Sequence, residues 1–581
     1  MTFRRFFTSF ALLGLLAGSC NAAVIARDAT KTLSTPRGSV QAYSSNGVDR
    51  YTVPYAVPPV GTNRFQDPVD VGSFASSLSL ALSPRSCHAP RSLSLDASKL
   101  PPVCAQLDAN GQVTGSEDCL YVTIYTPSTA TPSSKLPVLA WVHGGSFMSG
   151  GTADLDPSAF AKSQNAVVVL VSYRLGALGW LKYDKYGFTG NYGLKDVILA
   201  LSTSAADSVE GPQLTSTCLA EFIQSDIAAY GGDPSTVTLA GQSSGAEIVK
   251  SLLVTPCAAN LFRRAIMHSA PLDYNDQTVE TANGVGAAFV DRFAHCRGWV
   301  CVKTASVDSI LEWQAELVQQ AQLGNLSVPG VAMAEPLKTC IDGSLVTRDF
   351  RQVVQSGGQL ENPSRELIFT TTKDEACLTI YQVFGLYFGA GPYPQTLDDP
   401  SVQGMLAMFY GNRVAAINQS GLWDASLLPS DDDAVRKQLV RLGTDFVWTC
   451  PNTVSARALS NAGKVFLAEF DIGVPFNGAS TPTLCKDRVG HQDDLPLLFR
   501  IPSSSARLTF VQQTAQLELF TRWSAFMRSG DPNASGYAAW PLVAGQAGQE
   551  KVFVFGGADG KSKGAVQTAP RKDECAVYTF A

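Results

Sequence analysis

The sequence predicts an α/β protein built on a large, mostly parallel central sheet that is flanked by helices. Short apolar runs rich in Val and Leu, bounded by Gly, Pro or Ser, alternate along the chain with stretches of helical periodicity. Uninterrupted apolar runs of this length are typical of strands buried on both faces of a parallel sheet, and their alternation with helices places a helical layer on each face. The predicted strands are LPVLAWV (136–142), AVVVLVSY (166–173), TVTLA (236–240), LFRRAIMHS (261–269), RELIFTT (365–371) and KVFLAEF (464–470).

Helical periodicity is clearest in two segments, residues 309–322 and 510–530. The region from about 380 to 440 is also helical in character, and we expect it to be an insertion in the sheet. Two segments have the composition of loops, residues 76–115 and 202–217. Because long connections in a compact domain are often lids or binding loops, residues 202–217 are a candidate lid.

The composition excludes some classes of function. Hydrophobic residues make up 45% of the chain and charged residues 16%, as in a folded globular protein. A formal net charge of -6 gives no positive field for a phosphate backbone, so nucleic acid is not expected as a partner. Beyond the N-terminal segment no apolar run is long enough to span a bilayer, so stable membrane insertion is not expected.

The first 22 residues are predicted to be a signal peptide. MTFRR supplies a positive start, FFTSFALLGLLAG an apolar segment and SCNAA a small-residue cleavage site after Ala22. Residues 23–581 then form one large domain that is secreted. Of the 13 cysteines only Cys20 is removed, and the even number that remains favours disulfides in an oxidising compartment. The candidate glycosylation sites are the sequon residues Asn325, Asn418 and Asn533.

The stretch GQSSG (241–245) carries the strongest catalytic signal. A β-rich segment precedes it and the helix-compatible AEIVKSLLV follows it. This is the strand–turn–helix order of a nucleophile elbow, which presents a serine hydroxyl at the end of a sheet. Ser243 is therefore the predicted nucleophile. Since a serine hydroxyl reacts only when a base removes its proton, a histidine has to lie nearby.

His491 is the predicted base among the five histidines. In nucleophile-elbow enzymes the acid and the base follow the serine along the chain, which excludes His88 and His143. His268 lies in an apolar segment, as a core histidine would, and too close behind the serine to fit an acid-bearing strand between them. His295 adjoins a cysteine in a candidate small disulfide ring. His491 follows the last predicted strand in a Gly-bounded loop.

The acid should follow a strand between the serine and the base, where it can orient the imidazole. RELIFTTTKDEACL offers Asp374 and Glu375, and spacing alone does not choose between them. Glu469 and Asp471 in AEFDIG are a second choice, because alternation along a strand also places carboxylates on a solvated face. Negative charge that develops on the substrate is expected to be bound by backbone N–H groups of the Gly-rich turn HGGSF (143–147) and of Ser244.

Several motifs in order along the chain match one known family. They are VPYAVPPVGTNRFQDP (53–68), SEDCLYVTIYTP (116–127), SYRLGALGWL (172–181), TGNYGLKD (189–196), YGGDPSTVTLAGQSSGA (230–246), NLFRRAIMHSA (260–270), GTDFVWTCP (443–451) and FMRSGDPN (526–533). On these motifs the chain resembles the type-B carboxylesterase/lipase family of the α/β-hydrolase fold, most closely its secreted fungal members. The match extends through nearly the whole mature chain.

The resemblance implies roles for specific residues. The family's acid falls on Glu375, and its oxyanion donors fall on Gly145, Ser146 and Ser244. No metal and no organic cofactor is needed for this chemistry.

The resemblance also implies disulfides. The first joins Cys104 to Cys119, and a small ring joins Cys296 to Cys301. Cys450 is paired with either Cys575 or Cys485, and the other cysteines are not assigned.

Four departures from the family pattern bear on the substrate. Gln242 stands where the family usually has a glutamate, which removes a negative charge beside the nucleophile. Ser146 replaces a glycine of the oxyanion turn, and Ala376 and Cys377 follow the acid where the family has glycine. The loop between Cys104 and Cys119 is short and lacks the tryptophan with which cholinesterases bind quaternary ammonium.

The predicted function is therefore that of a secreted serine hydrolase that cleaves carboxylic esters through an acyl-enzyme. The short 104–119 loop favours soluble esters with short to medium acyl groups over lipid droplets. A triacylglycerol or sterol-ester lipase is the alternative, and a non-catalytic adhesion or binding module on the same fold ranks below both. The expected partner is a small-molecule or lipid ester, and the sequence does not determine the oligomeric state.

Overall fold

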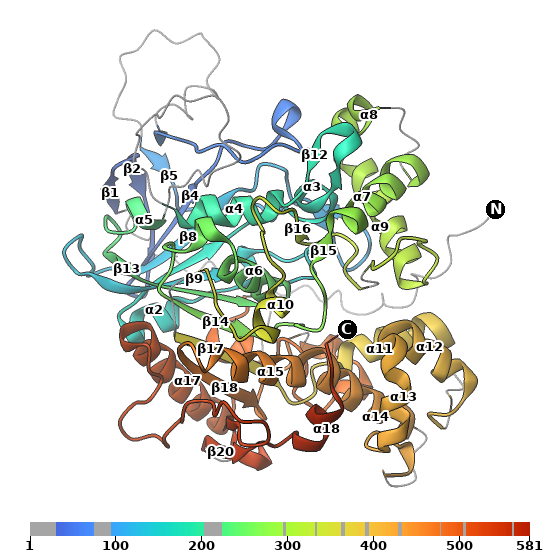
Figure 1. Cartoon of the computed structure of the whole chain (residues 1–581). Coiled ribbons are helices and arrows are strands. Elements are labelled where there is room, and N and C mark those ends of the chain that lie inside the picture. The colour runs from blue at the N-terminus through green and yellow to red at the C-terminus, as the bar shows by residue number, and fades with distance from the viewer. Residues whose placement is uncertain are drawn as a thin grey trace, which may run out of the picture.

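The computed structural model describes residues 31–580 except 75–93, 203–222, 294–297, 332–333, 362–365, 390–393, 395, 428–432, 477, 503–506 and 561–562. Its centre is an eleven-stranded sheet in the order β20-β19-β18-β17-β14-β13-β9-β10-β8-β4-β3 (Figure 1). These strands are β3 (Tyr43–Ser45), β4 (Val48–Pro54), β8 (Tyr121–Pro127), β9 (Leu136–Val142), β10 (Val167–Val171), β13 (Gly232–Gln242), β14 (Arg264–His268), β17 (Glu366–Thr372), β18 (Lys464–Phe470), β19 (Lys551–Phe555) and β20 (Ala565–Thr568).

The sheet is parallel in its centre and antiparallel at both ends. All neighbouring pairs from β10 to β19 are parallel, whereas β3, β4 and β8 at one end and β20 at the other pair antiparallel. The six strands that apolar runs predicted are all present in the parallel part. The antiparallel strands and the parallel strand β19 were not predicted; in VDRYTVP of β4, Asp, Arg, Thr and Tyr interrupt the apolar residues.

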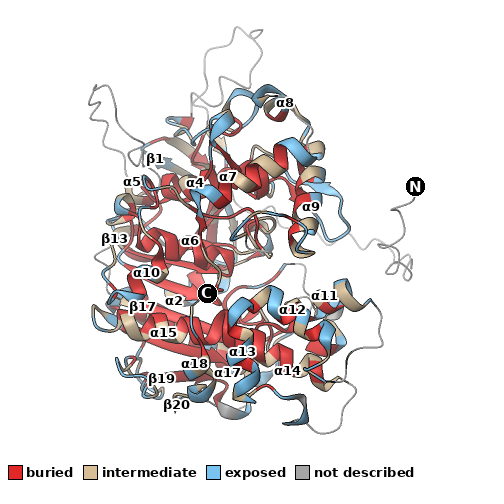
Figure 2. Ribbon diagram, turned by 45° about the vertical axis from the view of Figure 1, so that its right-hand side comes forward, coloured by how far each residue is buried: buried red, intermediate tan, exposed pale blue. Residues whose placement is uncertain are grey.

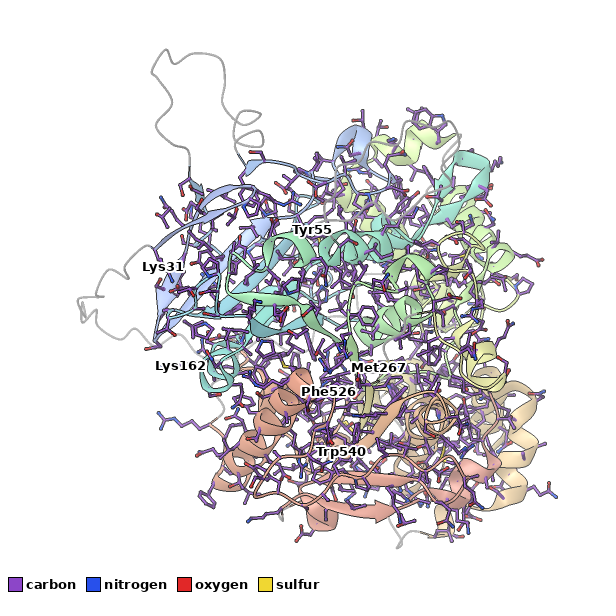
Figure 3. The ribbon with its side chains drawn as sticks, turned by 60° about the vertical axis from the view of Figure 1, so that its left-hand side comes forward. Lys31, Tyr55, Lys162, Met267, Phe526 and Trp540 are labelled. Atoms are coloured by element: carbon purple, nitrogen blue, oxygen red, sulfur yellow. A yellow bond between two sulfur atoms is a disulfide. The ribbon has the colours of Figure 1, made fainter. Side chains whose placement is uncertain are left out.

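Both faces of the sheet are covered. Along β9, Val138, Ala140 and Val142 belong to one core cluster, while Leu139 and Trp141 belong to another. The first face packs against α4 (Tyr192–Leu201), α6 (Ser244–Leu253), α10 (Phe350–Gln355) and α15 (Cys450–Leu459), and the second against α2 (Ser158–Gln164) and α17 (Phe510–Ser529). Figure 2 shows the central strands and α6 mainly buried, and Figure 3 labels Phe526 of α17 and Trp540, which belong to one core cluster.

Two helical groups stand beside the sheet. The predicted insertion contains α11 (Cys377–Phe388), α12 (Pro400–Tyr410), α13 (Val414–Ser420) and α14 (Ala434–Gly443), which share a separate core cluster. The other group contains α7 (Val279–Ala287), α8 (Trp299–Thr304) and the predicted helix α9 (Val307–Gln322). In Figure 1 both groups lie on the right-hand side, the first below the second.

Three disulfides join cysteines that are both in the described part of the chain. The predicted bond between Cys104 and Cys119 is present, and Cys450 is bonded to Cys575, one of the two partners proposed for it. The third bond, between Cys377 and Cys485, was not predicted. 

The remaining cysteines are only partly described. Cys257 and Cys301 are disulfide-bonded, whereas Cys296, Cys87 and Cys218 lie outside the described residues. Cys340 is a buried free thiol, and burial raises its pKa to about 12.

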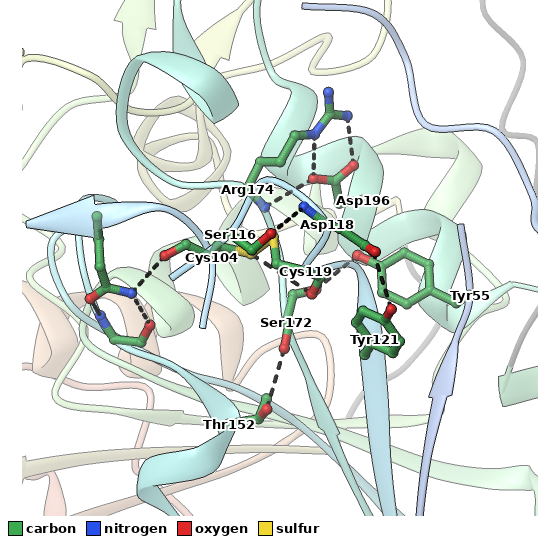
Figure 4. Close-up of a disulfide and its surroundings, with 12 residues drawn as sticks. Tyr55, Cys104, Ser116, Asp118, Cys119, Tyr121, Thr152, Ser172, Arg174 and Asp196 are labelled. Carbon is green, nitrogen blue, oxygen red and sulfur yellow. Dashed lines mark hydrogen bonds and ion pairs between the residues drawn. A yellow bond between two sulfur atoms is a disulfide. The ribbon is translucent and has the colours of Figure 1, made fainter. Parts of the chain in front are cut away.

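The Cys104–Cys119 loop lies beside a buried ion pair (Figure 4). Arg174 donates to both carboxylate oxygens of Asp196, at 2.7 and 2.8 Å. From within the loop, the Gln106 amide both donates to the carbonyl of Gly150 and accepts from its N–H, each at 2.9 Å. Because Gly150 follows the HGGSF turn, this loop braces the turn that was predicted to bind the oxyanion.

Two sequence predictions fall outside this description. The signal peptide, residues 1–22, is not described, and neither is the candidate lid beyond Ser202. Within the described ranges, every helix is too short or too polar to cross a membrane.

Candidate active site

Ser243 occupies a sharp turn between the end of β13 and the start of α6. Its backbone has φ 56° and ψ −127°, a left-handed conformation that costs energy for a residue with a Cβ atom. The turn is held on both sides, because the Ser243 N–H donates to the carbonyl of His268 at 2.9 Å and the Ser243 carbonyl accepts from the N–H of Glu247 at 3.0 Å. This is the geometry expected of a nucleophile elbow.

Small residues allow the elbow to contact its neighbours closely. A Cβ atom on Gly241 would lie 2.4 Å from the carbonyl oxygen of Gly245, and one on Gly245 would lie 2.2 Å from that of Val142. A Cβ atom on Gly144 would lie 3.0 Å from the Cβ of Ser243 and 2.5 Å from the Gln242 side chain. The HGGSF turn therefore packs directly on the nucleophile, with glycine required at the contact.

The turn presents unpaired backbone donors. Gly145 has φ 120° and Ser146 has φ 53°, so Ser146 adopts a backbone conformation that favours glycine. Within the part of the chain that the structure describes, the backbone N–H groups of Gly145, Ser146 and Ser244 have no acceptor. Ser244 is also the first residue of α6, where the helix dipole favours negative charge. These N–H groups are therefore available to bind an oxyanion.

His491 is hydrogen-bonded to Glu375 and to no other carboxylate among the described residues. Its Nδ1 lies 2.6 Å from Glu375 Oε2, while Glu375 Oε1 accepts the N–H of Thr372 at 2.7 Å. Glu375 is fully buried. Because a carboxylate only accepts, Nδ1 carries the proton, and the lone pair of a neutral imidazole is on Nε2.

The other candidate acids form ion pairs elsewhere or line a different cavity. Asp374 is paired with Arg488 at 2.6 Å, and Asp471 with Lys373 at 2.7 Å. Glu469 lines a separate cavity between β18 and α18 (Lys572–Val577). Of the candidate acids, Glu375 is the one that contacts His491 in the described part of the chain.

The described histidines that were set aside have structural contacts. His143 stacks on Tyr173, and burial lowers its pKa to about 4, so it is neutral. His268 is fully buried, hydrogen-bonded at Nδ1 to Asp494 at 2.8 Å and at Nε2 to the indole N–H of Trp523 at 3.3 Å. This agrees with a core histidine. His88 and His295 lie outside the described residues.

Several residues that sequence reasoning missed hold His491 in place. The Cys377–Cys485 disulfide joins the start of α11, directly after Glu375, to the loop that carries His491. Asp493 accepts two backbone N–H groups of this region, and burial raises its pKa to about 7. The ring of Trp448 lies 5.4 Å from that of His491. Trp448 lay in a quoted motif, but nothing local to the sequence distinguished the other residues.

A cavity of about 220 Å³ lies between the core and the helical insertion, with Trp448 in its wall. Most of its wall is apolar, from residues such as Val331, Ile380, Val383, Leu406, Phe409 and Val447. Among the described residues, no group of three or more His, Cys, Asp or Glu is arranged to hold a metal ion.

A group of charges is buried behind the elbow. Lys338 lies 2.7 Å from Glu247 and 3.0 Å from Glu335, and Lys250 lies 2.9 Å from Asp276. All five side chains are buried, and the carboxylates outnumber the ammonium groups. Burial, together with the negative charge of Glu335, raises the pKa of Glu247 to about 8.

Comparison with known proteins identifies relatives over most of the chain. A profile of the carboxylesterase family matches residues 30–203 and 217–577. Carboxylesterase 1D of Mus musculus is 27% identical over 513 residues, which cover 84% of this chain and 82% of the relative. Cocaine esterase of Homo sapiens is 26% identical over 502 residues, which cover 84% of this chain and 80% of the relative.

Solved structures agree with the fold. A PNB esterase aligns with a TM-score of 0.69 at 23% identity, covering 94% of this chain and 99% of its own. A carboxylesterase of Geobacillus stearothermophilus aligns with a TM-score of 0.70 at 24% identity, covering 94% and 100%. The architecture is therefore that of the α/β-hydrolase fold, as the sequence predicted.

The buried charges generate a prediction about stability and pH. A carboxyl group whose folded pKa is near 8, against 4.5 when exposed, binds more protons in the folded state than in the unfolded state between these values. Stability is therefore lost as the pH rises from about 4.5 to about 8. Glu247→Gln removes this contribution while keeping an acceptor for Lys338, so the variant should gain unfolding temperature relative to the wild type as the pH rises.

The measurement is the unfolding temperature of both proteins from pH 5 to pH 8. Burial also raises the pKa of Asp445 to about 6 and that of Asp493 to about 7, but both residues are present in both proteins. The difference between the two curves therefore reports Glu247 together with the buried groups coupled to it, Lys338 and Asp276. Parallel curves would contradict the assignment.

Proposed function

The chain belongs to the carboxylesterase family and is a carboxylic-ester hydrolase, and from this premise we propose that Ser243, His491 and Glu375 are its catalytic triad. The observation that carries the proposal is the convergence of a strained serine elbow, a histidine oriented by a buried carboxylate and a turn with unpaired N–H groups. Each comes from a different part of the chain, and together they supply the parts that acyl transfer needs.

The proposed reaction has two halves. His491 Nε2 takes the hydroxyl proton as Ser243 Oγ attacks the ester carbonyl carbon, and the N–H groups of Gly145, Ser146 and Ser244 bind the oxyanion. The tetrahedral intermediate collapses, the C–O bond to the alcohol breaks, and His491 returns the proton to the leaving alcohol. Water, activated by His491, then attacks the acyl-enzyme and releases the acid and the serine hydroxyl.

Glu375 acts through His491 in this mechanism. Its carboxylate fixes the imidazole with the proton on Nδ1 and stabilises the imidazolium that forms when Nε2 takes the serine proton. Thr372 donates to its second oxygen, so the carboxylate keeps its orientation when the charge of the imidazole changes. The reaction as written uses no metal and no organic cofactor.

Soluble esters with short to medium acyl groups are the proposed substrates. The cavity beside Trp448 has a volume of about 220 Å³, below the ~300–1,000 Å³ of pockets for drug-sized ligands. It exceeds the ~150 Å³ of a cavity that binds benzene, so a chain of several carbons fits it. Its apolar wall is also what a lipase would need, and hydrolysis of triacylglycerols or sterol esters is therefore the second candidate.

Secretion is part of the same proposal. The signal features of residues 1–22 and the disulfides of the described fold support an oxidising destination. The sequon residues Asn325, Asn418 and Asn533 are exposed, which glycosylation requires. Asn533 also exchanges hydrogen bonds with the backbone of Trp540, so a glycan there would have to leave these bonds in place.

The triad is tested by Ser243→Ala with p-nitrophenyl acetate as the substrate. Loss of the nucleophile should lower kcat/KM by about 10⁴-fold or more, because the oxyanion donors alone give little turnover. The unfolding temperature of the variant shows whether the fold is intact. A folded variant with wild-type activity would rule out Ser243 as the nucleophile.

The substrate class is tested by the dependence of activity on acyl length. We expect kcat/KM for soluble p-nitrophenyl esters to rise from acetate to a medium chain and then fall, since the cavity holds a limited volume. Rates on an emulsified long-chain triacylglycerol should be lower than on the best soluble ester. A preference for the emulsion would support the lipase instead.

A further inference from the structure

Gln242, directly before the proposed nucleophile, contacts the proposed base. Its Nε2 lies 3.0 Å from His491 Nε2, and its side chain is fully buried. Ser243 Oγ, by contrast, makes no hydrogen bond to any residue that the structure describes. The lone pair of His491 therefore faces an amide donor and not the serine hydroxyl.

The chemistry of the neighbours fixes which end of the amide faces the imidazole. His491 donates its Nδ1 proton to Glu375, so the neutral ring has only an acceptor at Nε2. Only the NH₂ end of Gln242 can satisfy that acceptor. The other end is also satisfied, because Gln242 Oε1 accepts from the Nε2 of Gln492 at 3.4 Å. The contact with His491 decides the orientation, because the amide of Gln492 can itself be turned to suit either end of Gln242.

Resting on the proposed function, we propose that Gln242 is a positioning residue that holds the neutral form of His491 between turnovers. A donor to the lone pair stabilises the neutral imidazole, which is the form that can act as a base. Ser243 displaces the amide when it donates its own proton to Nε2. Once the ring is protonated, the amide can turn its oxygen toward Nε2–H, so one side chain can serve both charge states.

A carboxylate at this position would act differently. The family usually carries glutamate before the nucleophile, and an ionised glutamate accepts hydrogen bonds but donates none. Facing Nε2 it would favour the imidazolium and leave fewer molecules with a free base at mildly acidic pH. Gln242 therefore extends the working range of the base toward lower pH.

The other charged groups around His491 would be the same in every variant of Gln242. Glu375 faces Nδ1 from the loop after β17, which also holds the Asp374–Arg488 pair. Asp493 follows on the loop of His491 itself. Three further charged or titratable groups lie nearby. They are Asp494, which is paired with His268, Asp445, which is hydrogen-bonded to Trp423 and paired with Arg571, and Glu247 on α6.

The test compares kcat/KM against pH for the wild type, Gln242→Met and Gln242→Glu with a neutral soluble ester. The acidic limb of the profile is the fall of kcat/KM toward low pH. In Gln242→Glu this limb should lie about one to three pH units higher than in the wild type, as expected for a new opposite charge beside an imidazolium. Gln242→Met removes the donor without adding a charge, so its limb should move in the same direction by less. The rate of inactivation by a fluorophosphonate, which needs no deacylation, should show the same order.

A matched control buries a carboxylate elsewhere. Gln438 is a fully buried glutamine on α14 whose amide accepts from Arg441, so Gln438→Glu keeps a partner. Its acidic limb should coincide with that of the wild type. If both Gln242 variants also keep the wild-type acidic limb and differ only in rate, Gln242 has a packing role and the positioning proposal is wrong.

The outcome distinguishes a failure of this proposal from a failure of the proposed triad on which it rests. A wild type that hydrolyses no ester and reacts with no fluorophosphonate would overturn the proposed triad. A wild type that does both, with variants whose limbs do not move, would overturn only the role of Gln242.

Discussion

The left-handed backbone of Ser243 is the constraint on which the rest of the site depends. A residue with a Cβ atom takes that conformation only where the surrounding structure holds it. Here the ends of β13 and β14 and the first turn of α6 hold it. The same turn brings the chain so close to Gly144 and Gly245 that no side chain fits at either position. The nucleophile, the oxyanion turn and the start of α6 are therefore parts of one tightly packed unit.

The proposed base and the proposed acid are brought to this unit by a different set of contacts. Glu375 is fixed by the backbone at the end of β17, while His491 is on a long loop after β18. The Cys377–Cys485 disulfide ties these two segments together, Asp493 accepts the N–H of Gly490 next to His491, and the ring of Trp448 packs near the imidazole. The Cys104–Cys119 loop does the same for the oxyanion turn through Gln106. Strain at the serine is thus balanced by covalent and hydrogen-bonded support around it.

Residue patterns predicted many of the strands and the candidate catalytic residues, and there is a physical reason why the other features could not be predicted. Six of the parallel strands were predicted because their apolar runs are continuous, whereas the parallel strand β19 was missed and antiparallel strands such as β4 mix polar residues into theirs. His491 was proposed as the base from chain order and from the contexts of the other histidines, and it stays a prediction. Spacing left Asp374 and Glu375 open, because it does not contain the direction in which adjacent side chains point; in the structure Asp374 faces Arg488 and Glu375 faces His491.

The residues that contact the predicted site residues were harder to predict from the sequence. Gln106 and Gln242 act through contacts between segments far apart in the chain, and a single sequence does not show which segments meet. Gln242 was noticed only as a departure from a family pattern, and its contact with His491 gives that departure a physical meaning. The lid predicted at residues 202–217 and the ring containing Cys296 lie outside the described residues and stay predictions.

The central claim is that one serine, one oriented histidine and three backbone donors form a single catalytic site. A crystal structure of the protein after reaction with a fluorophosphonate tests it most directly. The account predicts a phosphorus–oxygen bond to Ser243 Oγ, with the phosphonyl oxygen about 2.7–3.1 Å from the N–H groups of Gly145, Ser146 and Ser244. An adduct on another residue, or a phosphonyl oxygen that points away from these donors, would contradict it.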